Sequence, residues 1–371
     1  MTIEAEPGFR SLGQPVSRRI LQQAASNGRL GRTLLVHGPP GAGKDAFVDD
    51  LLALAMCSDP DAARRPCNAC RGCRDARSRS HPDLVIGSPD VWREMKHTGE
   101  SIVAAARRWL ADASGAPVVA DRRIVLIERA DRASEQIQNA LLKALEEPTD
   151  RHTFVLVADE ATRILPTIRS RAQPLRVGPV PRGELVAHLM DVERLPQDLA
   201  DALASLSGGL SGTAISFARD RALLDWRRRV QGELIDQLGR GRSDRFAAVR
   251  DLLDDTAALV PSARPAGEED EPRTPASVQR EAALLVVEAW IGCARDLLVA
   301  AAGRPQLAPG GELAPNLAEL GSSIGADPLI RAIARLEAVY AGIRENGAPR
   351  LALEAAMLTW PMLETRDAGE G

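Results

Sequence analysis

The segment with the clearest chemistry is a glycine-rich loop near the start of the chain. It reads Gly38-Pro-Pro-Gly41-Ala-Gly43-Lys44 and lies between an apolar, strand-like run and a helical pattern. This is the G-x-x-x-x-G-K part of a Walker A loop, in which backbone N–H groups face a phosphate and the lysine reaches the terminal phosphates. Asp45 stands where such loops carry a Ser or Thr that binds Mg²⁺. The loop therefore predicts either a residual nucleotide site or a turn that is now only structural.

A second segment bears on whether ATP would be hydrolysed. The run Arg123–Glu128 has the pattern of a buried strand, and Glu128 is an imperfect replacement for the aspartate that an active ATPase of this kind carries there. Arg129 occupies the position of the glutamate that orients the attacking water. Because a guanidinium cannot act as that general base, we do not expect hydrolysis by this chain. Arg129 itself is interpreted as a solvated or interface charge.

Four of the five cysteines form a third candidate site. Cys57, Cys67, Cys70 and Cys73 follow a C-x₉-C-x₂-C-x₂-C spacing, close enough for four thiolates to bind one Zn²⁺ tetrahedrally. Four protein ligands leave no position for water, so the zinc is predicted to be structural. Disulfides are the alternative, disfavoured because the chain starts without a signal-peptide pattern. Cys293 lies in an apolar helical pattern and is predicted to be a core residue.

Arginines accompany both kinds of site. Those near the cysteines raise the alternative of a zinc-ribbon DNA-binding module, although most are interpreted as solvated: Arg64, Arg65, Arg71, Arg74, Arg77 and Arg79. Farther along, a Ser170-Arg171-Ala172 turn follows a predicted strand. Arg171 is either an arginine finger, whose planar charge stabilises a transferring phosphate in a neighbour's site, or a surface charge.

The first half of the chain supplies a scaffold for these sites. Five short β-branched runs alternate with helical patterns, which predicts a mostly parallel α/β sheet whose strands are buried on both faces. The runs span residues 33–38, 83–87, 123–128, 153–159 and 174–177.

Length suggests how the chain divides into domains. Its 371 residues allow two to three domains at roughly 150 residues each. We predict an α/β P-loop domain over residues 1–178 with the cysteine module 57–73 inserted, a small helical lid over 179–222, and an all-α domain over 223–371. Four prolines and an acidic run predict a disordered loop at about 261–278.

Composition excludes several kinds of partner. The net charge of −4 gives no global basic field, and 3% aromatic residues leave few side chains for stacking on bases. Any DNA contact is therefore expected to be local or shared with other proteins. No run reaches the roughly 18 apolar residues of a membrane span. The chain is predicted to be cytoplasmic.

Together these motifs resemble the delta-prime family of bacterial DNA polymerase III clamp-loader subunits and, more distantly, the gamma/tau subunits. The shared order is GRLGRTLLVHGPPGAGK, the four cysteines, RIVLIERADRASEQIQNALLKALEEP and TFVLVADEATRILPTIRSRAQ, with ENGAPRLALEAAML near the C-terminus. The helix Gln138–Pro148 is particularly specific. Asp45, Arg129 and Ser211, the last in place of a sensor arginine, depart from the gamma/tau pattern and are similar to delta-prime.

The resemblance implies an AAA+ domain, a lid, and a collar that holds loader subunits in a ring. It further implies a stator-like role in loading the beta sliding clamp onto primer-template DNA, within the DNA-directed DNA polymerase III holoenzyme, a nucleotidyltransferase as a complex. Gamma/tau and delta subunits would be its partners. Arg171 would act in trans on ATP and Mg²⁺ bound by a neighbour, although Ala172 replaces the family's cysteine. A gamma/tau-like ATPase, resting on Lys44 and the intact glycines, and a zinc-ribbon DNA-binding module stay as alternatives.

Overall fold

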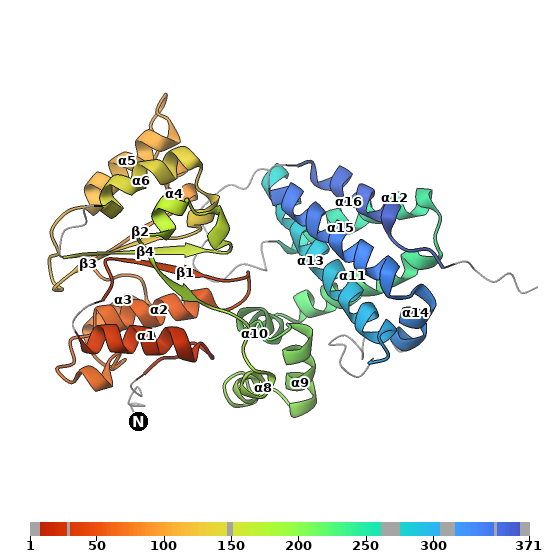
Figure 1. Cartoon of the computed structure of the whole chain (residues 1–371), viewed down its shortest axis with the longest axis horizontal. Helices are drawn as coiled ribbons and strands as arrows, with labels where there is room; N and C mark the ends of the chain where they lie inside the picture. The colour runs from red at the N-terminus through yellow and green to blue at the C-terminus, as the bar shows by residue number, and fades with distance from the viewer. Residues whose placement is uncertain are drawn as a thin grey trace, which may run out of the picture. The chain divides into compact units, whose positions relative to one another are not determined.

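A computed structural model describes residues 8–27, 30–146, 151–260, 275–304, 316–344 and 347–363 (Figure 1). The chain divides into two compact units. The first contains residues 1–185 together with 209–213, and the second contains residues 186–208 and 214–371. Whether the predicted lid over 179–222 forms a domain of its own stays a prediction.

The first unit is built on a five-stranded sheet in the order β2-β3-β4-β1-β5. All four pairings are parallel, and Leu35 of β1, for example, lies opposite Leu156 of β4 and Pro174 of β5. The predicted parallel sheet is confirmed. The strands are β1 (Thr33–His37), β2 (Leu84–Gly87), β3 (Arg123–Ile127), β4 (His152–Ala158) and β5 (Gln173–Arg176).

Helices cover both faces of this sheet (Figure 1). One face carries α1 (Pro15–Ser26), α2 (Lys44–Ala55) and α3 (Arg71–Arg77), and the other carries α4 (Pro89–Glu94), α5 (Ile102–Ala113) and α6 (Glu135–Glu146). The predicted helix Gln138–Pro148 falls in α6, and its last two residues lie outside the described part of the chain.

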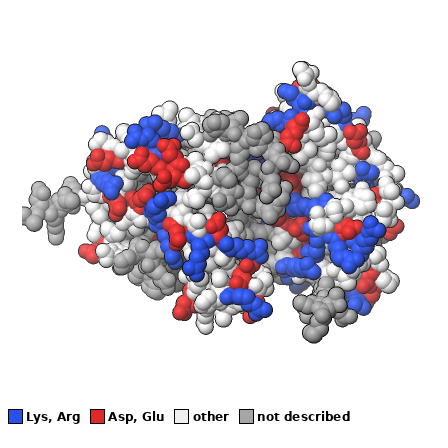
Figure 2. Space-filling model, turned by 180° about the vertical axis from the view of Figure 1, so that it is seen from behind, with Lys and Arg blue, Asp and Glu red and all other residues white. Residues whose placement is uncertain are grey.

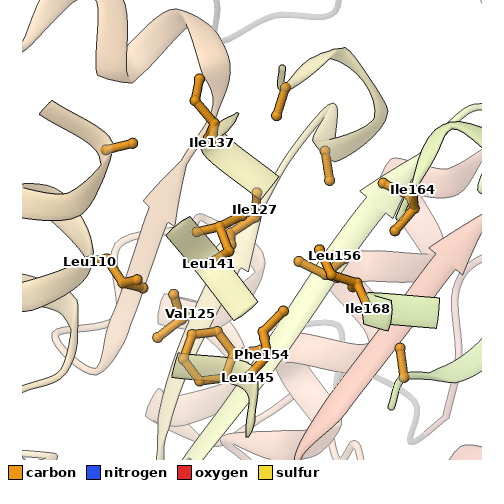
Figure 3. Close-up of a cluster of buried hydrophobic side chains, with 14 of the residues drawn as sticks. Leu110, Val125, Ile127, Ile137, Leu141, Leu145, Phe154, Leu156, Ile164 and Ile168 are labelled. Atoms are coloured by element: carbon orange, nitrogen blue, oxygen red, sulfur yellow. The ribbon is translucent and has the colours of Figure 1, made fainter. Parts of the chain in front are cut away.

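Two apolar cores fill the space between the sheet and its helices. Because successive side chains of a strand point to opposite faces, Val125 and Ile127 of β3 enter one core, whereas Ile124 and Leu126 enter the other. Figure 3 shows the first core, where the β3 and β4 side chains meet those of α5 and α6. These four side chains of β3 are fully buried.

The expectation that every strand is buried on both faces is wrong at the two edges of the sheet. The central strands β1, β3 and β4 are almost wholly buried, but β2 is half-buried along most of its length. In β5 only Leu175 is buried, and the other three residues are exposed. An edge strand has a neighbour on one side only and is short here, so the covering helices do not enclose it.

Short elements connect these layers, and a small module separates α2 from β2. The module contains η1 (Ala62–Arg64) and α3. The turns after β3 and β4 include η2 (Ala130–Arg132) and η3 (Ala161–Arg163), and α7 (Pro166–Arg169) leads into the amino end of β5. The site residues predicted from the sequence lie in this module, in the loops after β1 and β3, and in the turn before β5.

The second unit is entirely helical in its described residues, as predicted for the C-terminal part of the chain. Its longest helix, α13, packs against five others, and Cys293 is buried in it as expected. Helices α8 (Arg182–Asp191) and α10 (Ser211–Arg219) each contribute residues to both units. The others are α9 (Gln197–Leu206), α11 (Arg221–Asp236), η4 (Gln237–Gly239), α12 (Arg242–Leu259), α13 (Pro275–Ala301), α14 (Leu317–Ile324), α15 (Ala326–Arg344) and α16 (Pro349–Thr359).

The start of α13 shortens the predicted disordered loop. This helix begins at Pro275, a residue type that favours the first turn of a helix, so the loop expected to reach about residue 278 ends earlier. Residues 261–274 lie outside the described part of the chain. Among the described residues, none of the helices is long and apolar enough to cross a membrane.

Candidate functional site: a P-loop occupied by its own chain

The glycine-rich loop lies at the carboxyl end of β1, between that strand and α2, as the sequence predicted. Gly38 packs so tightly on the segment after β5 that a Cβ there would lie 1.8 Å from the carbonyl oxygen of Val177. Gly41 and Gly43 have φ angles of 73° and 87°, a left-handed conformation that favours glycine. Each of these three glycines therefore has a conformational or packing role in the loop.

Lys44 is directed at the protein itself. Its Nζ donates to the carbonyl oxygens of Gly38 at 2.8 Å and Pro39 at 2.9 Å, and it forms an ion pair with Asp159 Oδ1 at 2.8 Å. An ammonium group has three donors, so these contacts use all of them. The Lys44 and Asp159 side chains are only 10% and 17% exposed. The lysine that would bind the terminal phosphates of a nucleotide thus neutralises a carboxylate at the end of β4.

The loop is also covered by the segment that the resemblance marked at Ser211. The Ser211 hydroxyl donates to the carbonyl oxygen of Ala42 at 3.1 Å. The backbone N–H of Thr213 donates to the carbonyl oxygen of Gly41, also at 3.1 Å. A Cβ on Gly41 would lie 2.0 Å from the Thr213 hydroxyl, and one on Gly43 would lie 2.5 Å from that of Ser211. Hydroxyl groups of the chain therefore pack where the resemblance would place a sensor arginine.

Arg79, two residues after the end of α3, neutralises the carboxylates near the P-loop. Arg79 forms ion pairs with Glu128, with Asp49 at 3.2 Å and with Asp45 at 3.9 Å. Asp45 stands in place of the Walker A Ser or Thr, and Glu128 is the imperfect replacement for the aspartate of an active ATPase. In the structure both face a guanidinium, and Asp49, one turn after Asp45 on α2, completes the group.

The electrostatics of this cluster reflect burial and mutual charge. Burial raises the pKa of Asp49, and the charge of Asp45 adds to that effect while Arg79 opposes it. Burial alone would lower the pKa of Arg79, but the carboxylates of Glu128, Asp49 and Asp45 outweigh it and raise that pKa. Arg79 therefore stays charged throughout the physiological range and keeps the cluster partly neutralised.

Arg129 has a similar internal role. It adopts a left-handed conformation with φ of 49°, and its Nη1 forms an ion pair with Asp90 Oδ2 of α4 at 2.8 Å. Its side chain is 28% exposed. The residue that replaces a catalytic glutamate thus connects the end of β3 to the helix after β2, a role that the prediction of a solvated or interface charge did not include.

The four cysteines converge as predicted. Their Sγ atoms all lie within 4.8 Å of one another, with separations of 4.0 Å for Cys67–Cys73 and Cys57–Cys70. Four thiolates about 2.3 Å from a tetrahedral zinc would be roughly 3.8 Å apart, so the spacing fits that ion. All five cysteines are free, which argues against the disulfide alternative.

Backbone donors prepare these sulfurs for a metal. N–H groups of Cys67, Cys70 and Cys73 donate to the sulfurs of Cys57, Cys67 and Cys70 at 3.4, 3.4 and 3.3 Å. Burial alone would raise the pKa of Cys70, but hydrogen bonds from Ser58 and Cys73 lower it to about 6. Burial raises the pKa of Cys57 and Cys73, so Cys70 is more ready than these two to bind a metal ion as a thiolate.

The arginines around the cysteines divide into two groups. Arg64, Arg71 and Arg74 are exposed, as predicted, and the partly buried Arg65 donates to the carbonyl oxygen of Asp59. Arg77 and Arg79 instead enter ion pairs with α2. These two are not among the solvated majority that the sequence predicted, because α3 and the turn after it direct them toward carboxylates of the P-loop helix.

Arg171 lies on the turn between α7 and β5. It is exposed, and its Nη1 donates to the carbonyl oxygen of Thr167 at 3.0 Å, whereas the neighbouring Ala172 is buried. Because β5 is parallel to β1, Arg171 lies at the amino end of this strand pair, whereas the P-loop follows the carboxyl end of β1. Arg171 as a finger acting on a neighbour stays a prediction.

Fold and site together define the first unit as an α/β domain with a P-loop after its first strand. Residues 13–181 match the protein family described as "DNA polymerase III, delta subunit". This match covers less than half of the chain, and the DNA polymerase III delta-prime subunits are among the proteins to which the chain is similar.

Two curated proteins and one solved structure are similar to parts of this chain. The chain is 29% identical to the DNA polymerase III subunit delta-prime of Pseudomonas aeruginosa strain PAO1 over 54% of its own length and 60% of that protein. It is 27% identical to the gamma/tau subunit of Mycobacterium tuberculosis strain H37Rv over 57% of this chain and 39% of that one. A solved gamma subunit-related protein from Thermotoga maritima covers 92% of this chain and 97% of its own at 16% identity, with a TM-score of 0.41. The chain thus spans about three fifths of the length of the delta-prime relative it matches.

Proposed function

We propose that this chain is the delta-prime-type subunit of a DNA polymerase III clamp loader, working in the cytoplasm as part of the replication machinery. In this role it assembles with gamma/tau- and delta-type subunits and helps to load the beta sliding clamp onto primer-template DNA. The observation that supports this role most directly is a P-loop domain of the right family whose Lys44 is held by Asp159 and whose carboxylates are held by Arg79. Such a domain suits a fixed subunit better than a motor.

The same contacts bear on the alternative of a gamma/tau-like ATPase. Phosphate binding by Lys44 would require breaking a largely buried ion pair, and removing one partner of such a pair costs about 3–5 kcal/mol. No described residue stands in the position of the general base, because Arg129 occupies it. We therefore propose that ATP and Mg²⁺ are bound by neighbouring subunits, and that Arg171 acts there in trans.

One Zn²⁺ held by Cys57, Cys67, Cys70 and Cys73 is part of the proposal. With four thiolates it would have a closed coordination sphere and supply a cross-link, with no catalytic step. The DNA-binding alternative for this module has less support, since Arg77 and Arg79 face the protein. On the surface drawn in Figure 2, basic and acidic side chains are interspersed.

The experiment is a clamp-loading assay with purified subunits from the same organism. Loading of labelled beta clamp onto primed, circular single-stranded DNA is measured with the full set of subunits and with this chain left out. The proposal predicts that loading depends on the chain and that Lys44→Met supports loading like the wild type if folded complex is supplied in equal amounts. Undiminished loading without the chain would refute the proposed role.

A further inference from the structure

The cysteine module is attached to both ends of the P-loop helix. At the carboxyl end of α2, Cys57 follows the capping residue Met56, and Cys73 Sγ lies 3.4 Å from the carbonyl oxygen of Ala53. The packing is close: a Cβ on Gly72 would lie 2.0 Å from the Met56 carbonyl oxygen. The cysteines therefore fix the position of α3 relative to the last turn of α2.

From the other end of α3 the chain returns to the first half of α2. Arg77 donates to Asp50 Oδ1 at 2.7 Å, and the Asp50 side chain is completely buried. Two residues later, Arg79 adopts a left-handed conformation with φ of 56° and reaches Asp45, Asp49 and Glu128. The arginine that neutralises the P-loop carboxylates is thus held by the module.

The short helix between the cysteines and Arg79 needs this attachment. Helix α3 has seven residues, and helices shorter than about 12–15 residues are marginal on their own in water. Its first residues are tied by Cys70, which caps the helix, and by Cys73 inside it. The far end of α3 is held by Arg77 on Asp50 and by the buried Ala76, so the sulfurs are the contacts that fix its first turn.

The carboxylates in turn need Arg79. Asp45 and Asp49 are one helical turn apart on α2, a spacing at which like charges destabilise a helix. Glu128 adds a third negative charge from the end of β3. Without the guanidinium, repulsion among the three side chains would act on the first turns of α2 and on the loop before it.

We propose that metal binding at the four cysteines controls the order of the P-loop, with Arg79 as the connecting residue. This inference rests on the zinc site of the proposed function. Bound metal holds α3, α3 holds Arg79, and Arg79 holds the start of α2 and the end of β3 together. Loss of the metal releases Arg79 and loosens residues 38–49, although the cysteines themselves lie at the opposite end of α2.

Hydrogen–deuterium exchange of the full chain tests this link. Wild type, Arg79→Met and the control Arg71→Met are compared with zinc bound and after chelation under reducing conditions. Arg71 is the first residue of α3, but its side chain is 89% exposed and its ion pair with Asp75 stays within that helix. Arg79→Lys is a second variant, since an ammonium keeps the charge without spanning three carboxylates.

We expect chelation to speed exchange at residues 47–52 and at Glu128 by about tenfold in wild type and Arg71→Met. In zinc-bound Arg79→Met these amides should already exchange faster, and chelation should add little. Arg79→Lys should fall between the two. Chelation effects confined to residues 57–77, or Arg79→Met exchange equal to wild type at residues 47–52, would overturn the link.

Zinc content measured on the same samples separates the two proposals. One zinc per chain with no transmitted effect overturns the link and leaves the zinc site standing. Purified wild type without bound metal overturns both the site and the link. One zinc retained by Arg79→Met shows that the module is folded, so that faster exchange in α2 reports the missing guanidinium.

Discussion

Replacing Lys44 by methionine should lower the free energy of unfolding of the first unit. We expect neither the wild type nor the variant to bind nucleotide. The ion pair with Asp159 is 2.8 Å long, and its side chains are 10% and 17% exposed. Removing one partner of a buried pair costs about 3–5 kcal/mol. Arg132, 3.8 Å from the same Asp159 carboxylate, offsets part of that loss, so we expect about 2–3 kcal/mol.

The assay is thermal and urea unfolding of the isolated chain with and without Mg²⁺-ATP. For a unit of this size each kcal/mol lowers Tm by about 2–4 °C, which gives a loss of roughly 4–12 °C for Lys44→Met. The control Lys96→Met changes an exposed lysine and should stay within about 0.5 kcal/mol of the wild type.

Nucleotide is the second arm of that experiment. A site saturated at 100 times its Kd would add about 2.7 kcal/mol to the stability of the wild type. We expect no such increase, because Lys44 is held by Asp159 and the loop is covered by Ser211 and Thr213. A Tm that rises with Mg²⁺-ATP in the wild type and not in Lys44→Met would refute the reasoning and favour the ATPase alternative.

Three further predictions concern other parts of the first unit. Purified under reducing conditions, the chain should carry one zinc by elemental analysis, and Cys73→Ser should carry much less. In a reconstituted loader, Arg171→Ala should lower the ATPase rate at least about tenfold, whereas the exposed neighbour Arg169→Ala should not. The buried Asp83 accepts hydrogen bonds from the N–H groups of residues 118–120, which lower its pKa despite burial. Asp83→Asn should therefore cost about 1–3 kcal/mol in urea unfolding at pH 7, and the difference should shrink below about pH 4 as the wild-type carboxylate is protonated.

Local patterns in the sequence were enough to predict the scaffold. A β-branched run, a glycine-rich turn and a helical period are each read within a few residues, and each predicted strand exists. The cysteines were equally local, since four sulfurs within 17 positions can converge with little constraint from the rest of the chain. The residue pattern of a strand does not show whether the strand lies at an edge of the sheet. Edge position depends on the order of the strands in the sheet.

The state of the site depended on pairs that no local pattern specifies. Lys44 follows β1 and Asp159 follows β4, so the two residues of this ion pair are far apart in the sequence. Arg79 and Glu128 are 49 positions apart. Asp159 carried a usable signal, a carboxylate directly after a strand that ends beside the P-loop. Arg79 was one of six arginines near the cysteines, and only the geometry of α3 distinguishes it from its solvated neighbours.

Assembly tests the central claim most directly. The chain is mixed with gamma/tau- and delta-type subunits of the same organism, and the mixture is analysed by size-exclusion chromatography with light scattering. The proposed function predicts one stable hetero-oligomer that contains this chain. Elution of the chain on its own, beside a complete complex of the other subunits, would contradict it.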